Sequence, residues 1–488
     1  MLCNILYWVY AAVYYHTLNG DTVSYILTAK AYIAGDYAQA VNGYWSPLIS
    51  WLLVPLMLIS NDAAFAFYSI NYLCMVCSIV LLYHIIKHYI QGTWYVMVLV
   101  CVCTGLCILY ATYLTADVLF TTIMLWYVYT MHRVKPNKLA YVWYGIMGAL
   151  LYLSKSYGFY FFLVHFLVYT LYLNRKVIGS VVLPLGTNTI VFLLITLCWA
   201  YTVKVCTKQP LSLSTAAAYN LSIVDDAGKV THIQDGLLPP TLPYKYTAWQ
   251  NVAYHVTDAI ATKRPILFSV KRILNNTATT LQAFNNYPRY GVYVCILLIV
   301  IMLITKVKYT VPTMLWSVLL LSIAGYLFYF IDMRYILTAY LLLIILIGYT
   351  LSKLYIPNIT IQLLCYITFV YITIRPIVDI VIQRSKQPEQ IAYHISKYIS
   401  TNNIANTHNY ATYSPYEQQG LVYYNSGIDY GGIAKYAHDT TLLFSILHKY
   451  DIQLLILPDT ASAIPALMQY YKPLPIPNIR GNTVMVSR

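Results

Sequence analysis

Long apolar runs recur along the first 375 residues of this 488-residue chain, and they limit its fold more than any other feature. Runs of about 18 or more apolar residues match the length of a helix that crosses a lipid bilayer. The chain is therefore predicted to be a polytopic α-helical membrane protein. We expect about eleven spans, with ends defined to within a few residues, over residues 2–18, 63–86, 94–112, 117–132, 139–154, 157–173, 177–203, 288–305, 310–331, 334–351 and 355–375.

The composition excludes a soluble globular protein, because 60% of the residues are hydrophobic and only 9% are charged. The formal net charge of +14 does not indicate a nucleic-acid partner, since the basic residues are spread over many loops and form no single stripe. The 53 tyrosines suit membrane interfaces and wet cavities, where an aromatic ring with one polar end is useful.

The basic residues orient the predicted spans, because cytoplasmic connections are rich in Lys and Arg. The short connections on one side carry only Lys30, Lys155 and Arg334 as bases. This predicts a cytoplasmic N-terminus and an outer C-terminus, and it places all 16 acidic residues on the outer side or at its membrane edge. Any carboxylate chemistry is therefore expected on the outer face. The opposite, cytoplasmic connections hold nine bases and no acid: Lys87, Arg133, Lys135, Lys138, Arg175, Lys176, Lys306, Lys308 and Lys353.

Two outer loops are long. Residues 19–62 begin with an amphipathic helical stretch that stops at Gly35, and "GYWSPLISWLLVPLMLI" follows. This second stretch is too short to span and has tryptophans near both ends, so it is typical of a helix lying in the interface. Residues 204–287 form a loop that is too long to be only a connector. We assign residues 1–377, with both loops, to one transmembrane domain.

Residues 378–488 are predicted to form a soluble α/β domain on the outer side. The segments "HNYATY", "GLVYY", "IQLLIL" and "NTVMV" have strand patterns, and "TTLLFSILHKY" has a helical pattern with Asp439 as its cap.

Three aspartates in the outer segments are candidates for function. Asp21 suits either the N-cap of a helix that starts at Thr22, or a general base or metal ligand at the membrane surface. Asp117 stands at the start of a predicted span, where it suits the helix dipole, but an acid at the edge of an apolar helix is also a functional candidate. Asp36 follows Gly35 and is typical of a solvated turn.

Two basic residues stand out on the same face. Lys155 lies in a tight hairpin, where it fits either a lysine that reaches the surface or a phosphate contact. Arg334 lies between two spans, two residues after Asp332, and fits either a local salt bridge or a phosphate ligand.

No metal site is evident from the histidines and cysteines. His84 and His88 have the i, i+4 spacing of a metal pair, but they lie at the predicted cytoplasmic end without a nearby carboxylate. Most of the ten cysteines fall within apolar spans, and the C-x-x-C at 74–77 lacks a second pair at zinc spacing. These cysteines are interpreted as small buried hydrophobic residues.

Five short motifs follow one another on the predicted outer side: "GDTVSY" with "AGDY", then "YWSPLISW", "LTAD", "LSKS" and "DMRY". Their order, together with a short first span and an outer α/β tail, resembles the GT-C membrane glycosyltransferases that use polyprenyl-phosphate sugars. Protein O-mannosyltransferases and the transferase that adds aminoarabinose to lipid A belong to that family. The resemblance covers most of the chain by architecture, although each motif is short.

The resemblance implies roles for individual residues. Asp21 matches the catalytic aspartate of the first loop, and Asp117 matches the second acidic position. The matched bases, which would bind the donor, are Lys155 and Arg334. The aromatic residues within the motifs complete the predicted substrate-binding set, and they are Tyr25, Trp45 and Tyr335.

One element departs from the family pattern. The lipid A transferase has a Glu-Lys-Pro-Pro element where this chain has Trp45, Ser46, Pro47 and Leu48. The glutamate that would bind a metal and the lysine that would bind a phosphate are thereby missing, so the sequence leaves the need for a divalent metal open and names no other cofactor.

The implied reaction moves a sugar from a polyprenyl-phosphate donor to an acceptor hydroxyl by a single inverting displacement. A carboxylate would take the hydroxyl proton, and Lys or Arg would stabilise the departing phosphate. The partners are the donor lipid, a membrane, and a glycan, lipid or protein acceptor, with a bacterial inner membrane as the expected location. A lipid-linked sugar flippase and a non-catalytic partner in envelope glycan assembly are the alternatives, although we find no matched halves of the kind transporters show.

Overall fold

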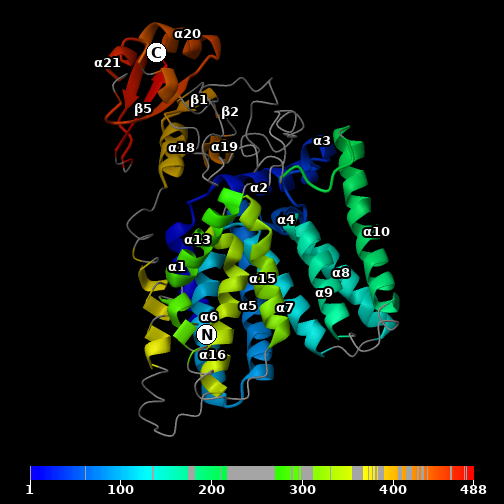
Figure 1. Ribbon diagram of the computed structural model, residues 1–488. Helices are drawn as coiled ribbons and strands as arrows, with labels where there is room; N and C mark the ends of the chain where they lie inside the picture. Colours follow the sequence, from blue (N-terminus) through cyan, green and yellow to red (C-terminus); the bar gives the residue numbers. More distant parts are fainter. Residues whose placement is uncertain are drawn as a thin grey trace.

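The computed structural model describes a helical bundle with a small sheet near the C-terminus (Figure 1). The description covers most of the first 216 residues, much of the region from 270 to 353, and parts of the C-terminal region. The described residues are 2–60, 62–133, 137–173, 182–208, 210–216, 270–286, 290–294, 296–297, 300, 312–329, 331–353, 367–371, 373–375, 377–379, 382, 390–404, 409–413, 420–425, 428–429, 433–436, 438–461, 464–477, 479 and 481–487.

The N-terminal part is built almost entirely of helices. Several begin with a side chain that caps free backbone amides, as Asp62 does by accepting from Phe65 N at 3.0 Å. The helices are α1 (Leu2–Tyr14), α2 (Gly20–Ile33), α3 (Tyr37–Ala40), α4 (Leu48–Ile59), α5 (Ala63–Tyr89), α6 (Thr93–Ala111), α7 (Asp117–Arg133), α8 (Lys138–Ser154), α9 (Tyr157–Leu173) and α10 (Val182–Thr207).

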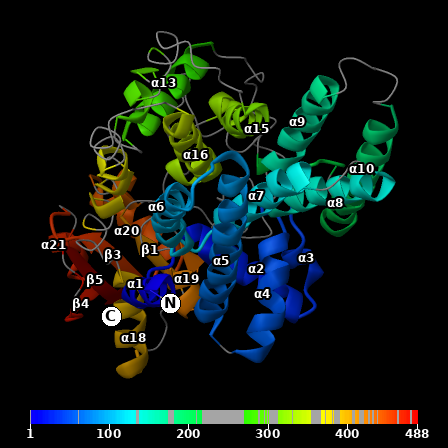
Figure 2. The same cartoon turned by 90° about the horizontal axis from the view of Figure 1, so that it is seen from below.

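A second group of helices packs beside this set. Seen from below, α15 and α16 lie next to α9, α7 and α6, whereas α10 lies at the edge with α8 and α9 (Figure 2). The second group comprises α13 (Val270–Asn286), α15 (Thr313–Ala324), the 3₁₀ turns η3 (Tyr326–Phe328) and η4 (Met333–Ile336), and α16 (Leu337–Lys353).

Three described helices are long and apolar enough to cross a membrane, by length and composition alone: Ala63–Tyr89, Leu183–Thr207 and Met333–Lys353. Other predicted spans coincide with shorter helices, and the predicted spans 288–305 and 355–375 lie largely outside the described residues. The helical character of the prediction is confirmed, and the count of eleven spans stays a prediction.

The predicted span 310–331 is not one helix, which corrects the sequence-based assignment. The helix α15 ends at Ala324, and a 3₁₀ turn follows. The Tyr157 hydroxyl donates to Leu321 O and accepts from Gly325 N at 3.0 Å, so it takes backbone groups at the point where the helix ends. A Cβ atom on residue 325 would lie 1.9 Å from Tyr157 Cε2, so any larger residue there would displace the Tyr157 ring.

The C-terminal part contains a five-stranded sheet in the order β2-β1-β3-β5-β4. β1 is parallel to β2 and β3, whereas β5 is antiparallel to β3 and β4. Asp439 caps α20 as predicted, since it accepts from Leu442 N at 3.0 Å. The elements are α18 (Ile391–Thr401), β1 (Asn409–Thr412), α19 (Gly420–Asn425), β2 (Ile428–Asp429), η5 (Ile433–Tyr436), α20 (Thr440–Lys449), β3 (Leu454–Pro458), α21 (Ile464–Leu467), β4 (Tyr471–Leu474) and β5 (Asn482–Ser487).

One strand prediction in this region is wrong. The segment "GLVYY" forms the helix α19, which packs against α2 and α18. Tyr424 from this helix donates to His16 O at 3.2 Å, and Lys30 lies 4.7 Å from the centre of the Tyr423 ring. One side of α19 thus packs against α2, a long-range contact that the local sequence does not encode. The C-terminal part thus lies directly against the helix that carries Asp21.

Candidate active site

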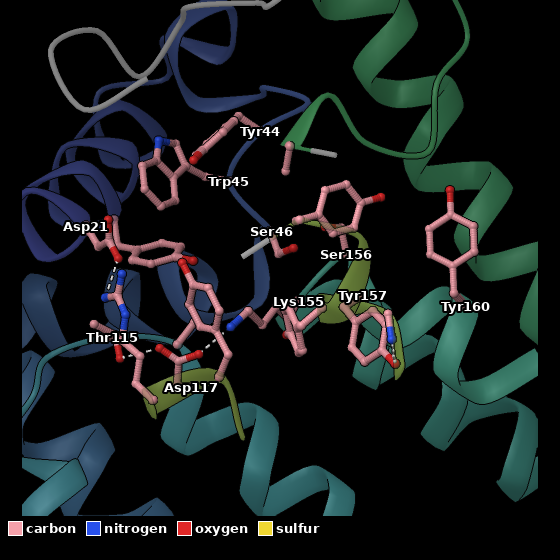
Figure 3. A pocket seen from close by; sticks show the side chains of 18 of the residues that line it. Asp21, Tyr44, Trp45, Ser46, Thr115, Asp117, Lys155, Ser156, Tyr157 and Tyr160 are labelled. Atoms are coloured by element: carbon pink, nitrogen blue, oxygen red, sulfur yellow. Dashed lines mark hydrogen bonds and ion pairs between the residues drawn. The ribbon is translucent and has the colours of Figure 1, made fainter. Parts of the chain in front are cut away.

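A cavity of about 360 Å³ lies where α2, α7, α9, η3 and η4 converge (Figure 3). This volume is in the range of small-molecule sites. Two acids and two bases line it, and they are Asp21, Asp117, Lys155 and Arg334. Its other walls are largely aromatic, formed by Tyr25, Tyr44, Trp45, Tyr157, Tyr160, Tyr326, Phe328, Tyr329 and Tyr335.

All seven residues that the sequence marked as a site line this one cavity. These residues come from distant parts of the sequence, since Asp21 and Arg334 are 313 residues apart. Short motifs far apart in the sequence therefore meet at one place in the fold. Their separate roles in catalysis and binding stay predictions.

The first ion pair joins Asp21 to Arg334. The Arg334 Nη1 atom donates to Asp21 Oδ2 at 2.5 Å, and the Arg334 Nε atom lies 3.3 Å from Asp332 Oδ2. The Asp332 carboxylate also accepts from the Arg334 backbone amide at 3.1 Å and so begins η4. The local bridge expected from the sequence exists, but it is accompanied by a shorter, long-range bond to Asp21.

Asp21 is not the N-cap of its helix, which corrects one of the two interpretations open at the sequence level. Asn19 caps α2, because its Oδ1 atom accepts from Thr22 N at 2.9 Å. Asp21 instead lies in the first turn, where the helix dipole favours a negative charge. Its carboxylate points into the cavity toward the guanidinium of Arg334 (Figure 3).

The second ion pair joins Asp117 to Lys155. The Lys155 ammonium donates to Asp117 Oδ1, and Thr115 Oγ1 donates to Asp117 Oδ2 at 2.8 Å. The Asp117 side chain is only 8% exposed and that of Lys155 is 21% exposed. The lysine therefore turns inward to a carboxylate and does not extend along the surface.

Both cations lie close to one aromatic ring. The Lys155 Nζ atom lies 3.7 Å from the centre of the Tyr335 ring, and the Arg334 Cζ atom lies 5.2 Å from the same centre. Tyr326 stacks on Tyr335 with the ring centroids 5.1 Å apart. The face of an aromatic ring attracts cations, so Tyr335 holds both side chains near one point of the cavity.

Burial changes the proton affinities of two groups in the wall. Burial is the largest influence on the pKa of Lys155 and lowers it, even though the Asp117 carboxylate acts in the opposite direction. Burial also raises the pKa of the Tyr25 hydroxyl, and the neighbouring carboxylates of Asp21 and Asp117 add to the effect. Tyr25 is therefore a neutral hydroxyl at physiological pH.

The loop that carries Trp45 is fixed by its own asparagine. Asn42 Oδ1 accepts from Trp45 N at 2.7 Å and from Tyr44 N at 3.1 Å. The Trp45 ring meets Tyr25 edge-on, with centroids 5.0 Å apart. Trp45 and Ser46 line the cavity where the lipid A transferase pattern has Glu and Lys.

These residues do not fit a divalent metal at this position. An indole is no metal ligand, and one hydroxyl supplies a single weak donor. Within the described part of the chain, no three His, Cys, Asp or Glu side chains gather as a metal site would need. His88 of the predicted histidine pair instead packs against the His132 ring, with centroids 4.8 Å apart.

Several residues that hold the cavity wall were missed by the sequence analysis. Asn276 Nδ2 donates to Leu327 O at 2.9 Å and to Tyr329 O at 3.0 Å, and Arg272 Nη1 reaches Phe328 O at 3.4 Å. Both come from α13, at the end of the long loop, and both are buried. They bind carbonyl groups of the 3₁₀ turn η3 and of Tyr329, which follows it. Polar residues at every fourth position of α13 could have indicated a buried polar face, but the same spacing is also typical of a face exposed to solvent.

Asp36 is exposed, as predicted, and it caps a short helix where a turn was expected. Its side chain caps the short helix α3 by accepting from Gln39 N at 3.2 Å, and the bond is exposed. Gly35 before it has a φ of +72°, which suits a glycine that ends a helix. Asp36 is thus a control for Asp21 within the same loop.

Comparisons with known proteins agree with the resemblance that the motifs predict. The family model of dolichyl-phosphate-mannose-protein mannosyltransferases matches residues 45–201, which is less than half of the chain. A crystal structure of ArnT from Cupriavidus metallidurans bound to undecaprenyl phosphate is similar over 99% of this chain and 96% of that chain, with a TM-score of 0.60 and 12% identity. The apo structure of the same protein matches over 99% and 97%, with a TM-score of 0.56 and 12% identity. No curated protein matches the chain in sequence.

The resemblance to the GT-C glycosyltransferases is therefore confirmed at the level of the fold. At 12% identity, the shared architecture does not fix the reaction or the substrates. Those conclusions depend on the chemistry of the cavity.

Proposed function

We propose that the chain is a membrane glycosyltransferase that moves a sugar from a polyprenyl-phosphate donor to an acceptor hydroxyl. The observation that carries the proposal is the pair of ion pairs in one aromatic cavity, Asp21 with Arg334 and Asp117 with Lys155. Such a cavity supplies carboxylates for a proton and cations for a phosphate at the same place. The fold shared with ArnT, which is described with bound undecaprenyl phosphate, supports the choice of donor.

In the proposed reaction, the acceptor oxygen forms a bond to the anomeric carbon of the donor sugar, and the bond from that carbon to the phosphate oxygen breaks. The acceptor proton goes to a carboxylate, and the bonding electron pair leaves with the polyprenyl phosphate. A single displacement of this kind inverts the anomeric centre. The site must therefore hold a base on the acceptor side and cations on the phosphate side.

Asp21 is the better candidate for the base. Both oxygens of Asp117 already accept bonds, from Lys155 and from Thr115, and the side chain is almost fully buried. Asp21 is twice as exposed, at 17%, and it is paired with the Arg334 cation, which a phosphate would also attract. Asp117 then acts by holding the Lys155 ammonium in place.

Arg334 links donor binding to the state of the base. When the donor phosphate enters, it competes with Asp21 for the guanidinium, which can form two parallel bonds to a phosphate. The carboxylate then gives up part of its bond to Arg334 and becomes a stronger acceptor for the hydroxyl proton. Lys155 supplies the second positive charge, 3.7 Å from the Tyr335 ring that also faces Arg334.

The prenyl chain would leave the cavity on the side away from Asp21. Tyr160 lies at that end of the cavity (Figure 3), and its side chain is 53% exposed on α9. Phe328 also lines the cavity and is 40% exposed. Two large, exposed aromatic side chains in the cavity lining suit a lipid tail.

The cavity and the C-terminus would both face the outside, so a reporter fused after Arg488 should be outside, and a cytoplasmic reporter there would overturn this orientation.

The proposal is tested with purified protein in lipid nanodiscs and a panel of radiolabelled polyprenyl-phosphate sugars. Each donor is offered with glycan, lipid and protein acceptors, and the Asp21→Asn variant serves as the control. We expect label to move to one acceptor class in the wild type only. Movement of intact donor across a vesicle membrane without transfer would identify a flippase. Neither transfer nor movement with any donor would support an assembly partner.

A further inference from the structure

A chain of buried polar side chains joins three helices below the cavity. His165 of α9 lies between Tyr127 of α7 and Ser317 of α15, with Tyr127 Oη 2.8 Å from His165 Nδ1 and His165 Nε2 2.9 Å from Ser317 Oγ. Tyr127 and His165 are fully buried. Polar side chains at this depth among apolar helices are costly and are a candidate for function.

The hydrogen bonds of this network determine which atoms carry the hydrogens. Ser317 Oγ donates to Met314 O at 3.0 Å, so its only hydrogen is used and it must accept from His165 Nε2–H. His165 is then a neutral imidazole with an unprotonated Nδ1 atom, which accepts from the Tyr127 hydroxyl. Every donor in this network has an acceptor, and the bonds run from Tyr127 through His165 and Ser317 to Met314 O. A network that is fully satisfied in this way fixes one arrangement of the three helices.

Each of the three helices supplies one part of the cavity wall at the same end. α7 begins at Asp117, α9 begins at Tyr157, and α15 leads through Gly325 into Tyr326. At a rise of about 1.5 Å per residue, the network lies about 12–15 Å along each helix from these wall residues. Tyr157 makes the second connection between α9 and α15, through Gly325 N and Leu321 O.

We propose that His165 is a positioning residue for the glycosyl transfer described above. By binding α7 and α15 at once, it sets the distance between Asp117, which holds Lys155, and Tyr326, which stacks on Tyr335. Its hydrogen-bond partners Tyr127 and Ser317 do not line the cavity, so its effect on the reaction passes through the helices.

The test compares variants that break the network with variants that do not. His165→Leu removes both bonds, and Ser317→Ala removes one with a smaller change of volume. His165→Asn places an amide near the Nδ1 position and keeps an acceptor for Tyr127. Ser322→Ala is the matched control on α15, because Ser322 is buried but donates to Leu319 O of its own helix at 2.8 Å.

We expect His165→Leu to lower kcat about tenfold to a hundredfold, since a misplacement of about 1 Å can cost a hundredfold. The KM for the donor should change less than about threefold, because the binding groups are all present. Ser317→Ala should show a smaller loss of the same kind, His165→Asn should recover part of the rate, and Ser322→Ala should be silent. Normal kcat in both His165→Leu and Ser317→Ala would overturn the inference, even if the protein yield falls.

A second measurement needs no substrate and so separates this inference from the proposed function. Hydrogen exchange of the backbone amides in residues 325–329 should be faster in His165→Leu and Ser317→Ala than in the wild type or Ser322→Ala. Unchanged exchange there would show that the network holds only its immediate surroundings. If the wild type transfers no sugar at all, the proposed function fails, and the exchange data still decide whether the network orders the cavity wall.

Discussion

Replacing Asp21 by Asn should strengthen the binding of a polyprenyl phosphate while stopping the reaction. The Arg334 guanidinium is bonded to Asp21 at 2.5 Å, and this bond competes with any phosphate. The substitution keeps the size of the side chain and removes its charge. It should not disturb α2, because Asn19 and not Asp21 caps that helix.

The magnitude follows from the exposure of the pair. The side chains of Arg334 and Asp21 are 21% and 17% exposed, so solvent screens part of their attraction, and we take about 1 kcal/mol for the pair. Release of that bond corresponds to about a fivefold lower Kd for the phosphate. Loss of the repulsion between the Asp21 carboxylate and the phosphate acts in the same direction. Turnover should fall at least about a hundredfold, the lower range of what a general base contributes.

The assay is equilibrium binding of radiolabelled undecaprenyl phosphate, without a sugar, to the protein in nanodiscs. Asp36→Asn is the matched control in the same loop, and it should leave both binding and turnover unchanged, since Asp36 only caps α3. Equal or weaker binding by Asp21→Asn would refute the competition between Asp21 and the phosphate for Arg334. Near-normal turnover would refute Asp21 as the base.

Three further predictions concern the cations and the wall. Arg334→Ala should lower kcat/KM for the donor by about thirtyfold or more, from the loss of about 2–3 kcal/mol of charged hydrogen bonding, and Arg334→Lys should recover little because it lacks the planar fork. Full turnover in Arg334→Ala would leave only a structural bridge. Burial lowers the pKa of Lys155, so donor binding should weaken as the pH rises through that pKa and the ammonium loses its charge. Lys155→Arg should keep its binding at the same pH. Identical pH profiles of donor binding in the wild type and this variant would contradict the prediction. Gly325→Ala should lower the melting temperature and the transfer rate, because the new Cβ would lie 1.9 Å from Tyr157 Cε2. Gly186→Ala is the control and should change neither, because a Cβ there would have nothing within 4 Å.

The sequence was most informative where charge is rare. In a chain with 16 acidic residues, Asp21 and Asp117 stand out, and a lysine or arginine on the face that is poor in bases does so as well. Those four residues and three aromatic neighbours line one cavity. The order of the short motifs also predicted the GT-C fold, because several motifs in one order are more specific than any one of them alone.

The pairing of the charges could not be predicted. Asp332 is two residues from Arg334 and was the natural partner, yet the shorter bond goes to Asp21, 313 residues away. The break after Ala324 was also missed, since hydropathy records no difference between an apolar helix and an apolar 3₁₀ turn. It depends on Tyr157 reaching Gly325 N, which is a long-range contact. Likewise Asn276 has a polar side chain whose partners are the carbonyls of Leu327 and Tyr329, in and just after the 3₁₀ turn η3.

The most direct test is a mass-spectrometric count of polyprenyl monophosphate released against sugar transferred, in one reaction with purified protein. We expect one lipid monophosphate for each sugar moved in the wild type, and neither product above background in Asp21→Asn, although that variant binds the lipid phosphate. Release of a diphosphate, transfer without release, or equal product from Asp21→Asn would contradict a donor phosphate held by Lys155 and Arg334 with Asp21 as the base.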